Sequence, residues 1–283
     1  MKRLLLYTIK RTLVNSTMLS MAILFVLFWG VIIAYLEAPS FISQLQHVSL
    51  AFKNTVYLQY TSVWNASLVI LSLSTIAVGI AYILYFQTGA LPYLIRYTKL
   101  KASTYFASLY SGNLIASLIL ELLLIAIITL MFSHNGVGIA VTPSNIGIMI
   151  LAIILGSIFF ISFSVFLNLL VIRLRAYKLL NLFNYIPLII GTIVFALFAF
   201  ATITIKSPAI YYSNPYTATL ILLYYGYFGS FKLYTTAGTA ISLHLSIGLL
   251  ALSIVAWTIV LNLLNSVLVR KIQYVNIEEM RIM

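Results

Sequence analysis

Side chains able to do acid–base or metal chemistry are scarce among the 283 residues of this chain. There is no cysteine, and the four acidic residues are too few and too scattered for a paired-carboxylate site: Glu37, Glu121, Glu278 and Glu279. The three histidines do not offer two ligands at matching depth on facing helices: His47, His134 and His244. No Gly-x-x-x-x-Gly-Lys-Ser/Thr phosphate loop occurs. We therefore expect no catalytic site, no metal site, no bound cofactor and no ATP hydrolysis on this chain.

Glu121 differs from the other acidic residues because it lies deep in an apolar stretch, Ile119-Leu-Glu-Leu-Leu-Leu. A charge at the bilayer centre costs about 2.5–3.5 kcal/mol on insertion scales, so such residues usually face protein or water. One interpretation is a protonated or hydrogen-bonded packing residue between helices. The other is a role in a substrate path or in proton coupling.

The composition places these residues in a membrane. Hydrophobic residues make up 63% of the chain, charged residues 7%, and the mean hydropathy is +1.11. In soluble domains roughly a quarter of the residues are charged. The much lower charged fraction of this chain therefore excludes a water-exposed globular domain. The net charge of +12 could indicate nucleic acid, but the basic residues are strung along the ends of apolar stretches rather than gathered on a soluble face. We expect them to contact anionic lipid headgroups, with no nucleic-acid partner.

Six stretches approach or exceed the roughly 20 apolar residues that a helix needs to cross the hydrocarbon core. Backbone groups in lipid must bond within their own segment, so these stretches are predicted to be helices. The fold class is therefore an all-α integral membrane protein, a single transmembrane domain over residues 1–283. The predicted spans are about 18–36, 64–86, 106–132, 146–172, 179–205 and 242–269.

Basic clusters alternate with these spans. Short cytoplasmic loops are enriched in Lys and Arg, which predicts a multi-pass protein of the plasma membrane with both termini cytoplasmic. The basic clusters are Lys2/Arg3/Lys10/Arg11, Arg96/Lys99/Lys101, Arg173/Arg175/Lys178 and Arg270/Lys271/Arg281.

Five asparagines lie near the inner ends of the predicted spans. They are predicted to form hydrogen bonds across helices or to cap them: Asn168, Asn181, Asn184, Asn262 and Asn265.

The first 15 residues have an amphipathic pattern. Leu6, Ile9 and Leu13 recur at helical spacing, and Arg3, Lys10 and Arg11 fall elsewhere on the helix. This pattern predicts a helix lying in the inner membrane interface. It would serve either lipid attachment or the docking of a cytoplasmic partner.

The outer stretch 206–239 precedes the last span. Tyr216–Phe231 is apolar but short and contains Gly226 and Gly229, and a seventh span there would place the C-terminal basic cluster outside. We expect short helices that dip back into the outer leaflet. The many aromatic rings are typical of a membrane interface; alternatively they form an outer gate, with Tyr216, Tyr224 and Tyr225 as its candidates.

The loop at residues 87–105 joins spans two and three. Leu91, Leu94 and Ile95 have helical spacing beside Arg96, Lys99 and Lys101, which predicts a short amphipathic cytoplasmic helix. From the residues alone, it is either a solvated interfacial loop or an element that inserts into a groove on a soluble protein.

The loop and the start of the next span contain the succession Gly89-Ala90-Leu91…Leu94…Lys99-Leu100-Lys101-Ala102-Ser103…Tyr105…Ser108-Leu109-Tyr110. This succession resembles the loop between spans two and three of type-2 ABC exporter permeases, with Ala90 where that family usually has Thr. Ser213-Asn214-Pro215-Tyr216-Thr217-Ala218 is similar to the family's Asn-Pro-Leu-Thr/Ser-Tyr stretch, and the six spans and the basic N-terminal helix match as well.

The resemblance implies the membrane-spanning permease subunit of an ATP-driven exporter, and the scarcity of charged residues favours a lipid, hydrophobic peptide or drug-like substrate. Cytoplasmic ABC ATPase subunits carrying ATP and Mg would be partners, together with a second permease copy or homologue. Residues 1–15 become an elbow helix through Arg3, Leu6, Lys10 and Arg11, and Glu121 joins the candidate substrate path. The alternatives are a secondary transporter and an anchor or assembly subunit of a larger membrane complex. The implied ATPase-coupling residues are Gly89, Leu91, Leu94, Arg96, Lys99, Leu100 and Lys101.

Overall fold

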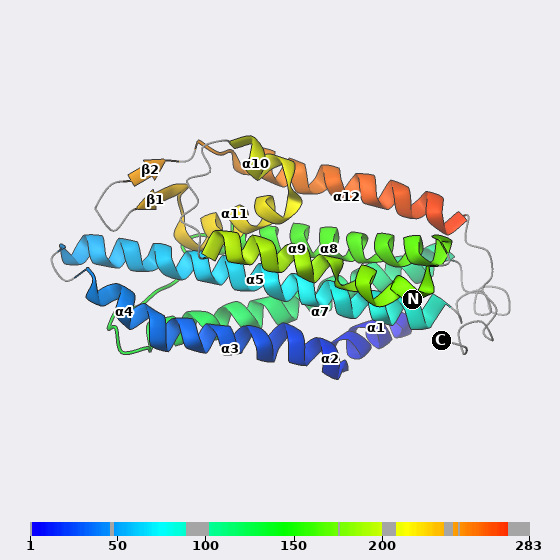
Figure 1. Cartoon of the computed structure of the whole chain (residues 1–283), viewed down its shortest axis with the longest axis horizontal. Helices are drawn as coiled ribbons and strands as arrows, with labels where there is room; N and C mark the ends of the chain where they lie inside the picture. Colours follow the sequence, from blue (N-terminus) through cyan, green and yellow to red (C-terminus); the bar gives the residue numbers. More distant parts are fainter. Residues whose placement is uncertain are drawn as a thin grey trace.

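The computed structural model describes residues 2–45, 48–88, 102–174, 176–199, 208–234, 240–242 and 244–270. Six apolar helices long enough to cross a membrane run along the length of the molecule (Figure 1). The prediction of an all-α membrane protein with six spans is confirmed at this level. The six helical stretches are Ser20–Ser43, Leu50–Leu84, Ala107–Ser133, Ile146–Leu174, Leu180–Ala199 and Ile247–Leu268.

The first span is built from four short helical pieces, two of which are π-helical, and one further short helix precedes it. Most of its buried residues recur every four positions. Four residues of an α-helix turn through about 400°, so a stripe with this repeat would drift about 40° per repeat. A π-helical segment has more residues per turn and corrects this drift. The buried stripe is Ala22, Val26, Gly30, Ala34 and Ala38. The preceding helix is α2 (Ser16–Leu19), and the four pieces are η1 (Ser20–Leu24), α3 (Phe25–Val31), η2 (Ile32–Glu37) and α4 (Ala38–Ser43).

Helix α5 (Leu50–Thr88) is the centre of the bundle and contacts α7, α8, α9 and α11. It begins at Leu50 instead of the predicted residue 64. Its first turns have a lower hydropathy because they contain Lys53, Asn54 and Gln59. The apolar stretch in the sequence therefore begins later than the helix does. This extension is held by aromatic packing, with the rings of Tyr60 and Phe41 stacked at a centroid distance of 4.4 Å.

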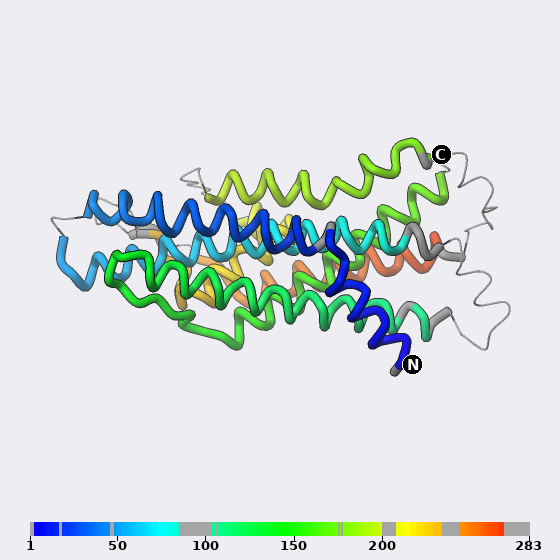
Figure 2. The backbone as a smooth tube through the Cα atoms, turned by 90° about the horizontal axis from the view of Figure 1, so that it is seen from below, coloured from blue at the N-terminus to red at the C-terminus, as the bar shows by residue number. Residues whose placement is uncertain are grey.

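Helix α1 (Lys2–Val14) lies obliquely to the spans and packs against the start of α7 (Figure 2). The end of α12, the end of α8 and the start of α7 are at the same end of the molecule (Figure 1). We call this end the basic end. The remaining long helices are α7 (Ala102–Ser133), α8 (Ile146–Leu174), α9 (Leu180–Ala199, after the short η3, Tyr177–Leu179) and α12 (Ile247–Arg270).

The predicted outer stretch contains two short helices, α10 (Pro208–Ser213) and α11 (Pro215–Phe228). Helix α11 lies in the half of the molecule away from the basic end, and α10 lies nearer the middle, beside the start of α12 (Figure 1). Helix α11 is almost entirely buried and packs against α8 and α5. A small antiparallel hairpin follows, in which β1 (Lys232–Tyr234) pairs with β2 (Ala240–Ser242). The all-α prediction did not include this hairpin.

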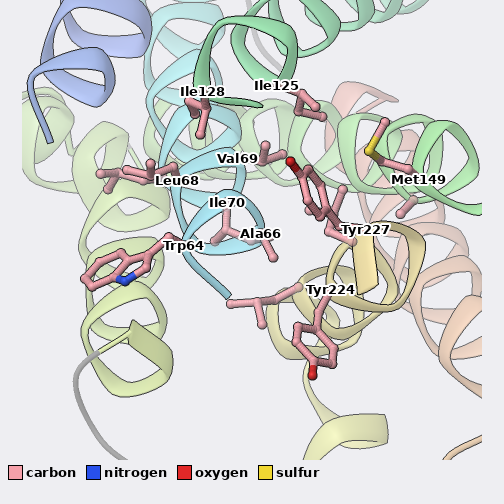
Figure 3. Close-up of a cluster of buried hydrophobic side chains, with 14 of the residues drawn as sticks. Trp64, Ala66, Leu68, Val69, Ile70, Ile125, Ile128, Met149, Tyr224 and Tyr227 are labelled. Atoms are coloured by element: carbon pink, nitrogen blue, oxygen red, sulfur yellow. The ribbon is translucent and has the colours of Figure 1, made fainter. Parts of the chain in front are cut away.

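Two clusters of buried apolar side chains fill the bundle. The larger one occupies the outer part, where Val69 of α5, Ile125 of α7 and Tyr227 of α11 meet (Figure 3). The smaller one lies toward the basic end and includes Ile80, Leu109 and Leu169. Large aromatic rings gather in the first cluster, among them Tyr57, Phe132 and Tyr224.

Candidate functional site

The predicted ATPase-coupling residues lie outside the described residues: Gly89, Leu91, Leu94, Arg96, Lys99, Leu100 and Lys101. The helices that flank them are described. Helix α5 ends at Thr88 and α7 begins at Ala102, both at the basic end (Figure 1). The two described helix ends that flank residues 89–101 therefore both lie at the basic end.

Helix α1 is docked directly on α7 at the basic end. Gly112 makes this possible, because a Cβ added there would lie 2.7 Å from Thr8 Cβ. One turn further along α1, the Thr12 hydroxyl donates a hydrogen bond of 2.7 Å to Asn113 Oδ1, and both side chains are buried. Close helix approach at a small residue, with a polar bond beside it, is a common way for membrane helices to associate.

The other faces of α1 point away from this contact. Arg3 and Lys10 are exposed, and the Leu6 side chain is 54% exposed. Arg11 is partly buried and its positive charge lies close enough to the Tyr105 hydroxyl to act on it, although burial is the larger effect and raises the pKa of Tyr105 to about 12. The residues of the predicted elbow helix thus share one short helix, with Arg3, Leu6 and Lys10 on its exposed side.

The same turn of α7 is bonded to α12. Tyr110 donates a hydrogen bond of 2.8 Å to Asn262 Oδ1, and the Asn262 amide donates one of 3.1 Å to Ser162 Oγ of α8. Asn265 donates to the Ser162 carbonyl oxygen at 3.0 Å. We refer to this set of contacts as the α7 junction, formed by Thr8, Thr12, Tyr110, Gly112, Asn113, Ser162, Asn262 and Asn265.

The predicted asparagine bonds across helices are confirmed at four of five positions. In addition to Asn262 and Asn265, Asn168 donates to the Ala81 carbonyl at 2.9 Å and Asn181 accepts from the Tyr82 hydroxyl at 2.9 Å. Asn184 is the exception, because it is buried and its amide has no hydrogen-bond partner among the described residues.

Charge is unevenly divided between the two ends. At the opposite end, the described charged residues are Lys53, Lys232 and the carboxylate Glu37. The excess of positive charge at one end agrees with the charge pattern from which cytoplasmic termini are predicted. At the basic end the described residues include Lys2, Arg3, Lys10, Arg11, Arg173, Lys178 and Arg270.

Glu121 lies near the middle of α7 and is completely buried. Ser72 of α5 is the side chain close enough to interact with its carboxyl group. Neither carboxyl oxygen has a hydrogen-bond partner within the part of the chain that is described. No cluster of three His, Asp or Glu side chains that could hold a metal occurs in that part either.

The candidate gate residues lie elsewhere, on α11. Tyr216 is buried against Phe160, with ring centroids 4.8 Å apart, and its hydroxyl donates to the Pro187 carbonyl at 3.3 Å. The buried Tyr224 donates to the Lys232 carbonyl at 2.7 Å, and Tyr225 is half-buried. Among the described contacts none joins Glu121 to these tyrosines, so the structure does not bring the predicted path residues together.

The Asn-Pro stretch has a local role in the fold. Asn214 is the N-cap of α11 and accepts a hydrogen bond of 2.9 Å from the Tyr216 amide, and Pro215 occupies the first turn, where its missing N–H costs nothing. Gly229 ends the helix with φ of 85°, a conformation suited to glycine. Helix capping alone is enough to explain this motif.

The comparisons with known proteins add no family. No family model matches the chain, and no curated protein matches it. Its likeness to type-2 ABC exporter permeases therefore rests on sequence features alone.

Proposed function

We propose that this chain is the membrane-spanning permease subunit of an ATP-driven ABC exporter. The observation that best supports the proposal is at the basic end. There an amphipathic helix, α1, is docked beside the two helix ends that flank residues 89–101. The exposed Arg3 and Lys10 of α1 are suited to carboxylates on a cytoplasmic protein.

On this proposal, ATP and Mg bind to separate ATPase subunits. When those subunits close on each other, this chain converts their closure into movement of its own helices. A push on α1 would reach α7 through Thr8 and Gly112, which are in close contact. It would reach α12 through the Tyr110–Asn262 hydrogen bond. Rigid secondary elements joined by hydrogen bonds are suited to such coupling.

Two permeases, identical or homologous, would line the path between them. Few charges line the helices, which favours a lipid, hydrophobic peptide or drug-like substrate. The protein would act in the plasma membrane with both termini cytoplasmic, since the basic end is then inside.

The test is purification of the tagged chain from its native membrane in mild detergent. We expect a partner with a Gly-x-x-x-x-Gly-Lys-Ser/Thr phosphate loop and ATP hydrolysis by the complex. Replacing Arg96, Lys99 and Lys101 together with Glu should remove both. The matched control is the same triple replacement in the next basic cluster, Arg173, Arg175 and Lys178, which should retain the ATPase. Equal retention of the ATPase by both triple variants would contradict the coupling assignment.

A secondary transporter is the alternative that one observation favours. The buried carboxyl of Glu121 is of the kind that proton-driven transporters use. A chain that purifies alone and transports substrate without ATP would support this alternative, whereas a large complex without an ATPase would indicate an anchor subunit.

A further inference from the structure

The carboxyl group of Glu121 lies in an environment that does not stabilise a negative charge. Its side chain is fully buried, and both oxygens lack a hydrogen-bond partner among the residues with described positions. An ionised carboxylate in a low-dielectric interior is strongly unfavourable unless it is paired or hydrogen-bonded. The neutral acid avoids this cost and gains an O–H donor.

No countercharge is available from the helices packed on this part of α7. These are α5, α8 and the first span, with α1 at the basic end. In α5 the only charged residue is Lys53, near the outer end, and in α8 it is Arg173, near the basic end. The first span carries Glu37 at its outer end, and the basic residues of α1 are at the basic end, where Arg11 is close to Tyr105. His134 follows α7 at the outer end.

Polar groups that are not charged do occur at this depth. Ser72 of α5 is within interacting range of the carboxyl. In α8, Ser164 and Asn168 bond the Ala77 and Ala81 carbonyls, both across a sequence separation of 87, so the two helices run in parallel register. That register places Ser157 level with residue 70, within a turn of Ser72, and the buried Ser157 hydroxyl also lacks a partner in the described chain.

We propose that Glu121 is a proton-binding site in the middle of the bundle, occupied as a neutral carboxylic acid at neutral pH. The proton can leave only when α7 separates from α5 enough to admit water to the carboxyl. Proton release is then tied to the relative movement of these two helices. This inference does not depend on ATP as the energy source, because it rests on the contacts of Glu121 alone.

Infrared spectroscopy of the full chain in lipid, with carbon-13 in its glutamate carboxyl groups, tests the occupancy directly. The chain has only four acidic side chains, all Glu, so a carboxylic-acid carbonyl band at neutral pH has few possible sources. We expect one such band in the wild type, its loss in Glu121→Gln and its retention in Glu37→Gln. Absence of the band in the wild type, or an unchanged band in Glu121→Gln, would overturn the proposal.

Carbodiimide labelling of the wild type assigns the site even if Glu121→Gln does not fold. The acid O–H adds across a C=N bond of the reagent: the oxygen bonds to the central carbon, the proton goes to nitrogen, and acyl migration leaves a stable N-acylurea. The membrane-soluble dicyclohexylcarbodiimide should label Glu121 at neutral pH. A water-soluble carbodiimide should leave Glu121 unlabelled. Equal labelling of Glu121 by the water-soluble reagent would show a water-exposed carboxylate and refute the proposal.

Discussion

Two regions of α7 hold polar side chains in opposite ways. At the α7 junction, Tyr110 and Asn113 bond to side chains of α12 and α1 at 2.8 and 2.7 Å. Eight residues further along, about 12 Å at 1.5 Å per residue, the Glu121 carboxyl is buried without a hydrogen bond within the described chain. Both regions are polar and both are removed from water.

The difference separates two uses of polarity inside a membrane protein. Bonds between helices fix their relative position, typically for about 0.6 kcal/mol each and at most roughly 1–2 kcal/mol. A buried acid that has no hydrogen bond or countercharge in the described chain does not fix the position of a helix and costs free energy, so a function is the better explanation for its presence. The junction is therefore interpreted as a mechanical contact and Glu121 as a chemical site.

The largest expected effect comes from forcing a permanent charge into the second region. Glu121→Arg should destabilise the folded chain by about 2.5–3.5 kcal/mol, the insertion cost of a charge at the bilayer centre. Glu121→Gln keeps the shape and the neutral state and should fold normally. Thermal unfolding of the two variants in detergent checks the difference, and equal stability would mean that water already reaches the site.

Filling the close contact between α1 and α7 should have the next largest effect. Gly112→Ala places a methyl group 2.7 Å from Thr8 Cβ, and overpacking of this kind costs about 1–3 kcal/mol. We expect α1 to separate from α7, seen as faster hydrogen exchange in α1. Gly248→Ala is the matched control, because the nearest atom to the added methyl there is 3.8 Å away. Unchanged exchange in Gly112→Ala would contradict the close packing.

The smallest effect should come from removing one hydroxyl at the junction. Tyr110→Phe deletes the hydrogen bond to Asn262 and should cost about 0.5–1.5 kcal/mol of unfolding free energy. Tyr7→Phe is the control, since the Tyr7 side chain is 55% exposed. A double-mutant cycle of Tyr110→Phe with Asn262→Leu measures the coupling between the two side chains. A coupling energy of zero would remove the bond between α7 and α12 from the proposed mechanism.

Much of the fold follows from hydropathy because a membrane imposes a length and a helix on each apolar stretch. The pattern fails where a helix leaves the hydrocarbon region, as at the start of α5, since polar residues there do not interrupt the helix. Hydropathy also does not distinguish an α-helical turn from a π-helical turn. The π-helical pieces of the first span become interpretable only when its buried stripe is seen, because a repeat of four does not by itself reveal which residues face the bundle.

The site was less predictable than the fold. The pattern of Leu6, Ile9 and Leu13 predicted the amphipathic character of α1, but the docked face is formed by Thr8 and Thr12. Threonine is only weakly polar, so two threonines do not by themselves predict a packing face. Their spacing of four residues, opposite a glycine in another helix, is the one signal that could have indicated it. Glu121 stood out in the sequence because a single acid in an apolar stretch is rare, although its missing partners are visible only in three dimensions.

The central claim is that the basic end receives a separate ATPase at residues 89–101. Because the chain has no cysteine, Lys99→Cys gives it a single thiol, to which a photoactivated maleimide crosslinker can be attached in native membranes. The expected product joins this chain to a protein with a Gly-x-x-x-x-Gly-Lys-Ser/Thr phosphate loop, and Ala140→Cys, an exposed position at the opposite end, gives no such product. A Lys99→Cys chain that crosslinks only to lipid, or to proteins without that loop, would contradict the claim.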